Sequence, residues 1–93
     1  MTQIDEEAAA TVNDITKTDA LILDCLADGR NAPSNIADEI ERHPKHVSDR
    51  LGTLRDRGLV RTVGRDAVSL HEITKRGRRI LDIYRDFQAA LKS

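Results

Sequence analysis

The sequence is poor in cysteine, in aromatic residues and in long apolar runs, and each shortage excludes a class of protein. Its 93 residues include one cysteine, Cys25, which cannot form an internal disulfide. No apolar run approaches the ~18 residues of a membrane span, and the first ten residues lack the basic and apolar regions of a secretory signal. We therefore expect a cytoplasmic protein that does not associate with membranes.

Glycine, proline and aromatic residues are also scarce, and their scarcity favours helices over strands. The chain has five glycines, two prolines and 2% aromatic residues, whereas 39% of its residues are hydrophobic. That hydrophobic content is enough for one modest core in a chain of this length. We predict one mainly α-helical domain.

Charge is distributed unevenly along the chain, although the net charge is only −1. Residues 1–29 carry seven acidic residues and one lysine, whereas residues 30–93 carry fourteen basic and nine acidic residues. Because local charge decides whether a polyanion is attracted, the second part permits DNA binding. Arginine outnumbers lysine 11 to 4 and aspartate outnumbers glutamate 11 to 5, a bias that resembles archaeal proteins from salt-loving organisms.

Residues 1–17 form an acidic N-terminal segment that is distinct from the rest of the chain. Residues 1–17 form either a short helix over residues 2–13, with Ala8 and Val12 on one side, or a frayed segment. The remainder, residues 18–93, is expected to form the folded domain.

Two helices are expected at the start of this domain. Thr18 is placed to cap a helix that begins at Asp19, and Gly29 is placed to end it. After a short connection, residues 34–40 carry apolar side chains at helical spacing and predict a second helix of about two turns.

A proline marks the start of the third helix. Pro44 is disfavoured inside a helix but favoured at its first position, so the chain is expected to stop near Arg42 and to restart as a helix over residues 44–57. Such a break between two helices is typical of a helix-turn-helix. The apolar positions of the restarted helix share one side: Val47, Leu51 and Leu54.

The remaining pattern predicts a hairpin and a final helix. Branched residues in 59–63 and 67–73 flank residues 64–66, and this arrangement is typical of a β-hairpin. Thr74 is then placed to cap a helix whose apolar surface is wider than one stripe. The order of elements indicates a mainly α winged helix-turn-helix with a small β-hairpin and an additional C-terminal helix.

Three segments carry a resemblance to a known family. HVSDRLGTLRDRGLV, residues 46–60, resembles the recognition-helix signature of winged-helix repressors, and ITKRGRRIL, residues 73–81, resembles the segment that comes after their wing. With SNIADEI, residues 34–40, the similarity covers roughly residues 18–82. The chain is most similar to MarR-type and archaeal halophage repressor-like regulators of transcription.

The resemblance implies a recognition helix in the major groove of double-stranded DNA and a wing on the backbone or in the minor groove. Helical geometry points Lys45 and Asp49 outward, where they can donate to guanine and accept from cytosine. An arginine near the hairpin tip, such as Arg65, suits a narrow minor groove. The DNA-binding candidates are Ser34, Lys45, His46, Ser48, Asp49, Arg50, Thr53, Arg55, Arg61, Arg65, Lys75 and Arg76.

Several of these residues also have a plainer interpretation. Lys45 and Asp49 could form a surface ion pair between successive turns, worth ~0.3–0.5 kcal/mol, although the surrounding motif favours a DNA role. Arg78, Arg79 and Arg85 are interleaved with acidic residues and are interpreted as a solvated helix face.

Nothing in the sequence indicates catalysis, a metal or a cofactor. Cys25 is interpreted as a small core residue, and the three histidines, His43, His46 and His71, show no recognisable ligand spacing. No nucleophile with a paired base and no glycine-rich phosphate loop is evident, so we expect no enzymatic activity. No small-molecule effector can be identified.

Symmetric dimerisation is expected because two copies double the few base contacts that one winged helix makes. The candidate dimer interface is the apolar side of the last helix: Ile80, Tyr84, Phe87 and Leu91. The same face could instead cover the first helix and the wing within one subunit. The predicted mechanism is repression by occlusion of an operator, and the alternative function is a winged-helix module for protein association.

Overall fold

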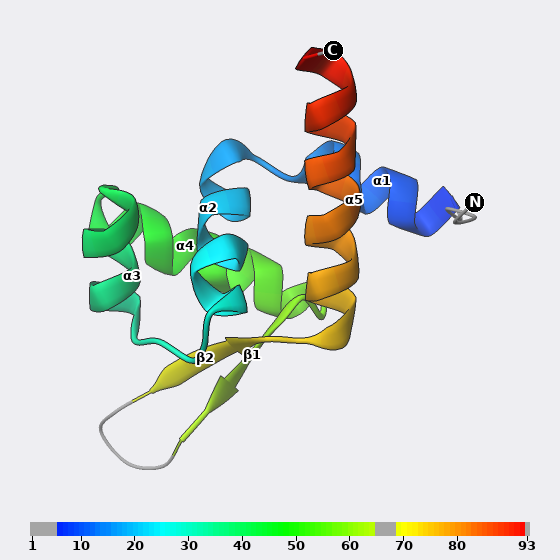
Figure 1. The fold of residues 1–93 in the computed structure, drawn as a ribbon. Coiled ribbons are helices and arrows are strands. Elements are labelled where there is room, and N and C mark those ends of the chain that lie inside the picture. The colour runs from blue at the N-terminus through cyan, green and yellow to red at the C-terminus, as the bar shows by residue number, and fades with distance from the viewer. Residues whose placement is uncertain (1–5, 65–68, 93) are drawn as a thin grey trace.

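The computed structural model describes residues 6–64 and 69–92 and confirms the predicted fold class. Five helices and one antiparallel hairpin follow one another in the expected order (Figure 1). Their bounds are α1 Glu6–Asp14, α2 Lys17–Ala27, α3 Pro33–Ile40, α4 Pro44–Asp56, β1 Val60–Val63, β2 Leu70–Ile73 and α5 Lys75–Lys92.

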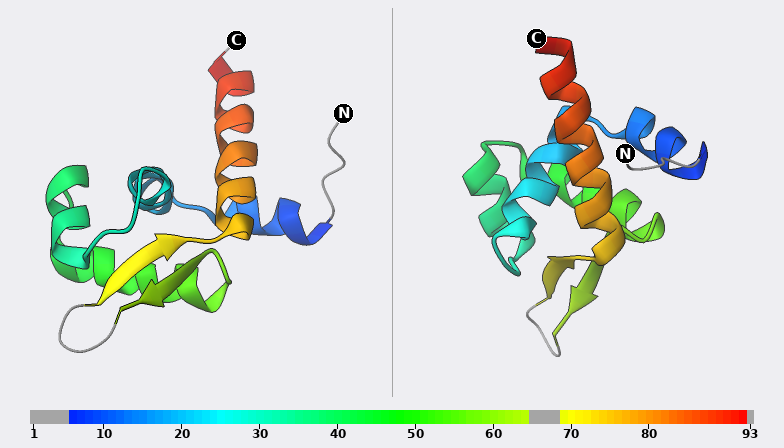
Figure 2. Two further views of the ribbon diagram at one scale, coloured as in Figure 1. Left: turned by 60° about the horizontal axis from the view of Figure 1, so that its bottom comes forward. Right: turned by 45° about the vertical axis from the view of Figure 1, so that its right-hand side comes forward.

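Helices α2, α3 and α4 form the helix-turn-helix unit, and the hairpin lies against one side of it (Figures 1 and 2). The long helix α5 crosses this group, and its C-terminal end projects away from α4 and the hairpin (Figure 2). One hydrophobic cluster joins all the helices and includes Ala8, Val12 and Ile15 from the acidic N-terminal part. Of the two alternatives for this part, residues 6–14 therefore adopt the helical one.

The start of α2 differs from the sequence prediction, since its cap is Thr16 and not Thr18. The Thr16 hydroxyl accepts the backbone N–H of Asp19 at 3.0 Å, and the Asp19 carboxylate accepts the backbone N–H of Thr16 at 3.1 Å. Both partners of a capping box are thus satisfied with Asp19 in the third helical position. Thr18 is instead buried inside the first turn.

Prolines begin both helices of the helix-turn-helix. Pro33 already lies in the first turn of α3, one residue earlier than the sequence predicted. Pro44 opens α4, where the side chain of His43 accepts the backbone N–H of Lys45 at 3.1 Å. Gly58, just after the end of α4, has a φ of 75° and turns the chain into the hairpin.

The hairpin is extended by one rung for which the sequence has no local signal. Val60 pairs with Ile73 and Val63 with Leu70 in the antiparallel register. On the other edge of β2, Asn31 and His71 exchange two backbone hydrogen bonds of 3.0 and 2.8 Å. The segment that links α2 to α3 therefore lies beside the wing like a short third strand (Figure 1).

The turn into α5 is closely packed. The Thr74 hydroxyl donates to the carbonyl of Gly58 at 2.7 Å and accepts the backbone N–H of Gly77 at 3.0 Å, so the predicted cap is confirmed. Gly77 is buried against the carbonyl of Leu59, and a Cβ at this position would lie 2.2 Å from that oxygen.

Candidate nucleic-acid interface

The N-terminal half of α4 presents polar side chains to solvent. Lys45, His46, Ser48 and Asp49 are exposed, whereas Val47, Leu51 and Leu54 on the opposite side are fully or almost fully buried. Neither Lys45 nor Asp49 takes part in any ion pair among the described residues, so the surface pair considered from the sequence does not form. These side chains, together with the positive end of the helix, are free to meet an anionic groove.

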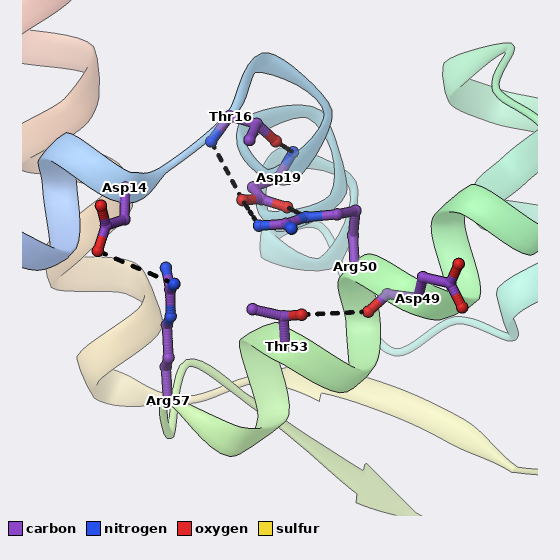
Figure 3. Close-up of polar contacts among 7 residues, drawn as sticks. All are labelled: Asp14, Thr16, Asp19, Asp49, Arg50, Thr53 and Arg57. Carbon is purple, nitrogen blue, oxygen red and sulfur yellow. Dashed lines mark hydrogen bonds and ion pairs between the residues drawn. The ribbon is translucent and has the colours of Figure 1, made fainter.

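Arg50 has a different role from the one predicted. Its Nε and Nη2 atoms donate to the two carboxylate oxygens of Asp19, each at 2.7 Å (Figure 3). Asp19 is completely buried, and the hydrogen bonds that Arg50 donates to this carboxylate raise the pKa of Arg50. The arginine therefore ties α4 to α2, and a phosphate would have to compete with a buried carboxylate for it.

The neighbours of Arg50 on α4 face other surroundings. Figure 3 shows the Asp49 carboxylate directed away from the Asp19–Arg50 pair. The Thr53 hydroxyl donates to the Asp49 carbonyl at 3.3 Å within the helix and is half-buried. Arg57, one residue beyond the helix, lies 3.9 Å from the Asp14 carboxylate and thus connects the end of α4 with α1 (Figure 3).

The wing carries a row of alternating charge. Arg61 on β1 pairs with Glu72 on β2, and Arg30 pairs with the other oxygen of that carboxylate at 3.0 Å. Hydrogen bonds from Arg61, reinforced by Arg30, lower the pKa of Glu72. Arg30 was not among the sequence candidates. Arg65, which was, lies outside the described residues.

The remaining candidates in the described part of the chain lie on α3, α4 and α5. Ser34 is exposed in the first turn of α3, and Arg55 is exposed on α4. Lys75 is exposed in the first turn of α5 without an ion pair in the described part of the chain, whereas Arg76 pairs with Glu7 of α1 at 3.1 Å. Lys75 is therefore more available than Arg76 to bind a phosphate.

His71 of β2 is buried, and Cys25 of α2 is partly buried. His71 is buried in β2 and its Nδ1 atom has no hydrogen-bond partner among the described residues. Burial, together with the charge of Arg55, lowers the pKa of His71. Partial burial and a hydrogen bond to Glu39 at 2.8 Å raise the pKa of Cys25 to about 11, so this thiol stays protonated near neutral pH.

The candidate dimer surface is only partly as predicted. Ile80 is 1% exposed and belongs to the core of its own subunit, so its assignment to a dimer interface is wrong. Tyr84 is half-buried, whereas Phe87 and Leu91 are 53% and 66% exposed. Ile80 lies on the side of α5 that packs into the hydrophobic core, and this core includes buried residues of α2.

A groove of about 790 Å³ runs between α1 and α5. Its lining combines apolar and charged side chains: Ala9, Val12, Asn13, Arg79, Asp82, Ile83, Asp86 and Phe87. The exposed face of Phe87 thus continues into an apolar hollow next to α1.

Several solved structures share this architecture. YusO from Bacillus subtilis superimposes with a TM-score of 0.81 at 19% identity, over 92% of this chain and 63% of that protein. BldR, a transcriptional regulator from Sulfolobus solfataricus, superimposes with a TM-score of 0.79 at 21% identity, over 95% of this chain and 67% of BldR. ZitR from Lactococcus lactis is a zinc-responsive MarR family member that was solved as a mutant in complex with DNA. It superimposes with a TM-score of 0.68 at 22% identity, over 74% of this chain and 49% of ZitR.

This chain has the winged-helix fold of MarR-type regulators. The resemblance stated from the sequence is therefore confirmed at the level of the fold. The chain spans about half to two thirds of the length of these proteins. No protein-family model and no curated protein matches the sequence. The likeness to halophage repressors therefore stays a prediction.

Two further features of the described residues bear on the function. Across residues 6–64 and 69–92, no helix has the length and apolar character that a membrane crossing requires. Over the same residues, no group of three or more histidine, cysteine, aspartate or glutamate side chains is arranged to hold a metal ion.

Proposed function

We propose that this protein is a sequence-specific double-stranded DNA-binding regulator of transcription without enzymatic activity, which represses by covering an operator as a dimer. The exposed N-terminal half of α4 is the observation that carries the proposal. Lys45 and Asp49 project from a helix whose opposite side is sealed into the core, and neither is engaged by another side chain in the described structure.

The chemistry of this surface fits base readout. Lys45 can donate to guanine, Asp49 can accept from the cytosine amino group, and Ser48 can do either. Asp56 at the far end of α4 would be repelled by phosphates. A helix that inserts its N-terminus and lifts its C-terminus avoids this repulsion and brings its positive end to the DNA.

Phosphate contacts come from outside the recognition helix in this arrangement. Ser34, Lys75 and Arg61 are exposed on three other elements, and Arg65 is a further candidate from the sequence. Contacts of this kind fix the position of the protein on the duplex, whereas Lys45 and Asp49 read the sequence. Arg50 is excluded from the proposed set because its side chain is only 23% exposed and is held by the completely buried carboxylate of Asp19, whereas Arg61 is 68% exposed.

A dimer formed through α5 is supported by its exposed apolar side chains. Phe87 and Leu91 are the large hydrophobic residues that the described structure leaves exposed, and both lie on the part of α5 that projects from the core (Figure 2). A two-fold dimer would present two recognition helices to half-sites one DNA turn apart, about 34–36 Å.

The decisive experiment is a footprint on genomic DNA fragments with the full chain and the Lys45→Ala/Asp49→Ala variant. We expect discrete protected sites for the parent chain and their loss in the variant, because base readout is removed without a change of net charge. Lys17→Ala/Glu6→Ala is a matched control, since both residues are exposed on the first two helices and their removal also leaves the net charge unchanged. The control should retain the parent footprints.

The second candidate function is a protein-association module, favoured by the exposed Phe87 and the groove beside α1. Binding of the parent and the Lys45→Ala/Asp49→Ala variant to every fragment with equal, sequence-indifferent affinity would favour this alternative and contradict the regulator.

A further inference from the structure

The structure contains a row of three charged side chains across the base of the wing. In the antiparallel register, Arg61 lies directly opposite Glu72. On the other edge of β2, Asn31 lies opposite His71, so Arg30 is the next residue along and also faces Glu72. Opposed pairs of unlike charge stabilise neighbouring strands, and here one carboxylate serves two arginines.

The row lies on the outer face of the wing. His71 and Ile73, which flank Glu72 in β2, are buried, and side chains alternate between the two faces of a strand. The side chains of Arg30 and Arg61 are 63% and 68% exposed, whereas that of Glu72 is 15% exposed beneath them. Both guanidinium groups are therefore accessible, and the carboxylate lies between them.

Each arginine keeps donors that the carboxylate does not use. Arg61 approaches one oxygen of Glu72 through Nε and Nη2, and Arg30 approaches the other oxygen through Nε. Among the described residues, Nη1 of Arg61 and both terminal nitrogens of Arg30 form no hydrogen bond. Two positive charges against one negative charge leave the row at +1, and the planar guanidinium fork matches the geometry of phosphate oxygens.

We propose that Arg30 and Arg61 form a phosphate-binding clamp at the base of the wing, with Glu72 as the residue that positions both. The ligand is the backbone phosphate of duplex DNA, so this inference rests on the proposed function. The clamp is separate from the recognition helix, and it adds Arg30, which precedes α3, as a contact. Glu72 holds the two cations in place before DNA arrives, which reduces the entropy lost when they bind phosphate.

The test measures binding of the full chain to a mixed-sequence 30-base-pair duplex at several salt concentrations. A phosphate contact adds about 0.9 to the magnitude of the slope of log affinity against log salt. Arg30→Gln and Arg61→Gln should each lower that magnitude by about 0.9, which corresponds to a loss of about eightfold at 0.1 M salt if the lines meet at 1 M.

Arg85→Gln is the matched control. Arg85 lies on α5 outside the wing, is half-exposed, pairs with Asp24 of α2 and loses the same charge in the variant. A clamp requires a larger change of slope for the two wing variants than for the control. If Arg30→Gln, Arg61→Gln and Arg85→Gln have equal salt slopes and unchanged thermal melting, the clamp is overturned, although the parent chain still binds DNA. Absence of parent binding to any duplex would instead reject the proposed function.

The Glu72→Gln variant distinguishes two roles of Glu72: positioning the two arginines, and contributing a negative charge. The variant gains one unit of positive charge, which by long-range attraction alone would strengthen binding. If Glu72 positions the clamp, its loss weakens binding or leaves it unchanged despite that gain. Tighter binding of the folded variant with a steeper salt slope would show that the arginines act without the carboxylate and would overturn its positioning role.

Discussion

Arg50 of the recognition helix is held by two parallel hydrogen bonds to Asp19, a completely buried carboxylate at the start of α2. The same carboxylate caps its own helix through the backbone of Thr16. One side chain thereby fixes both the beginning of α2 and the middle of α4. The orientation of the proposed DNA-reading surface thus depends on an ion pair behind it (Figure 3).

Replacement of Arg50 by alanine should destabilise the protein strongly. Loss of one partner from a buried ion pair costs about 3–5 kcal/mol, and Arg50 retains some exposure, so we expect a loss near ~3 kcal/mol in the free energy of unfolding. Denaturant unfolding measures this change. Lys45→Ala on the same helix is the control and should change stability by less than ~0.5 kcal/mol. Comparable losses in the two variants would contradict the role assigned to the pair.

Two helical glycines should respond to alanine in opposite directions. In Gly77→Ala the new Cβ would lie 2.2 Å from the carbonyl oxygen of Leu59, which is backbone and cannot move aside cheaply. We expect a loss of at least about 1–3 kcal/mol. Gly52 has no atom within 4 Å of such a Cβ, so Gly52→Ala should gain about 0.5–1 kcal/mol through helix propensity.

Thermal melting of both variants distinguishes close packing from a general sensitivity to alanine. If the melting temperatures of both variants shift in the same direction, the close contact of Gly77 with Leu59 does not determine how the protein responds to alanine.

Protonation of His71 should destabilise the fold in mildly acidic solution. Burial and the nearby Arg55 lower the pKa of His71 in the native state, whereas the unfolded chain protonates near the ordinary value of ~6.5. The unfolded state therefore binds more protons as the pH falls below ~6.5, and the stabilising contribution present above that pH is lost as the pH falls through the native pKa.

Unfolding free energies at pH 7.5 and pH 5 measure this effect. His71→Leu removes the titrating group, so its stability should change less between the two pH values than that of the parent. An identical pH dependence in both proteins would assign the loss to other groups. Glu72, whose pKa is lowered mainly by Arg61, is present in both proteins, so its contribution to the pH dependence cancels in the comparison.

Dimerisation is tested by a charge on the exposed part of α5. Phe87→Glu should convert the expected dimer to a monomer, because a carboxylate would be buried in an apolar contact without a partner. Sedimentation velocity gives the masses. Lys92→Glu, an exposed change on the same helix, is the control and should remain dimeric. A parent chain that sediments as a monomer at all concentrations would contradict the dimer itself.

The order of elements was predictable because its signals are local. Pro44 can begin a helix but not continue one, Gly58 can adopt the left-handed φ common just after a helix, and Val47, Leu51 and Leu54 recur at the helical period. None of these signals needs knowledge of a distant partner. The exposure of Lys45 and Asp49 was predictable from the same geometry, because the side opposite an apolar stripe must face outward.

The surroundings of each surface residue were decided by tertiary structure. Arg50 and Asp19 are 31 positions apart, and only the packing of α2 on α4 makes them partners. Ile80 shares its helical face with Phe87, yet Ile80 is buried in the core and Phe87 is exposed, because tertiary packing covers only part of that face. The pairing of Arg30 with Glu72 likewise depends on a strand rung between segments that share no sequence pattern.

The amino-acid sequence by itself determined the helices, the hairpin and the exposed side of the recognition helix, because propensity and periodicity act within a few residues. Tertiary packing alone decided which charges are engaged with one another and which apolar side chains remain open, because those contacts join segments that are distant along the chain.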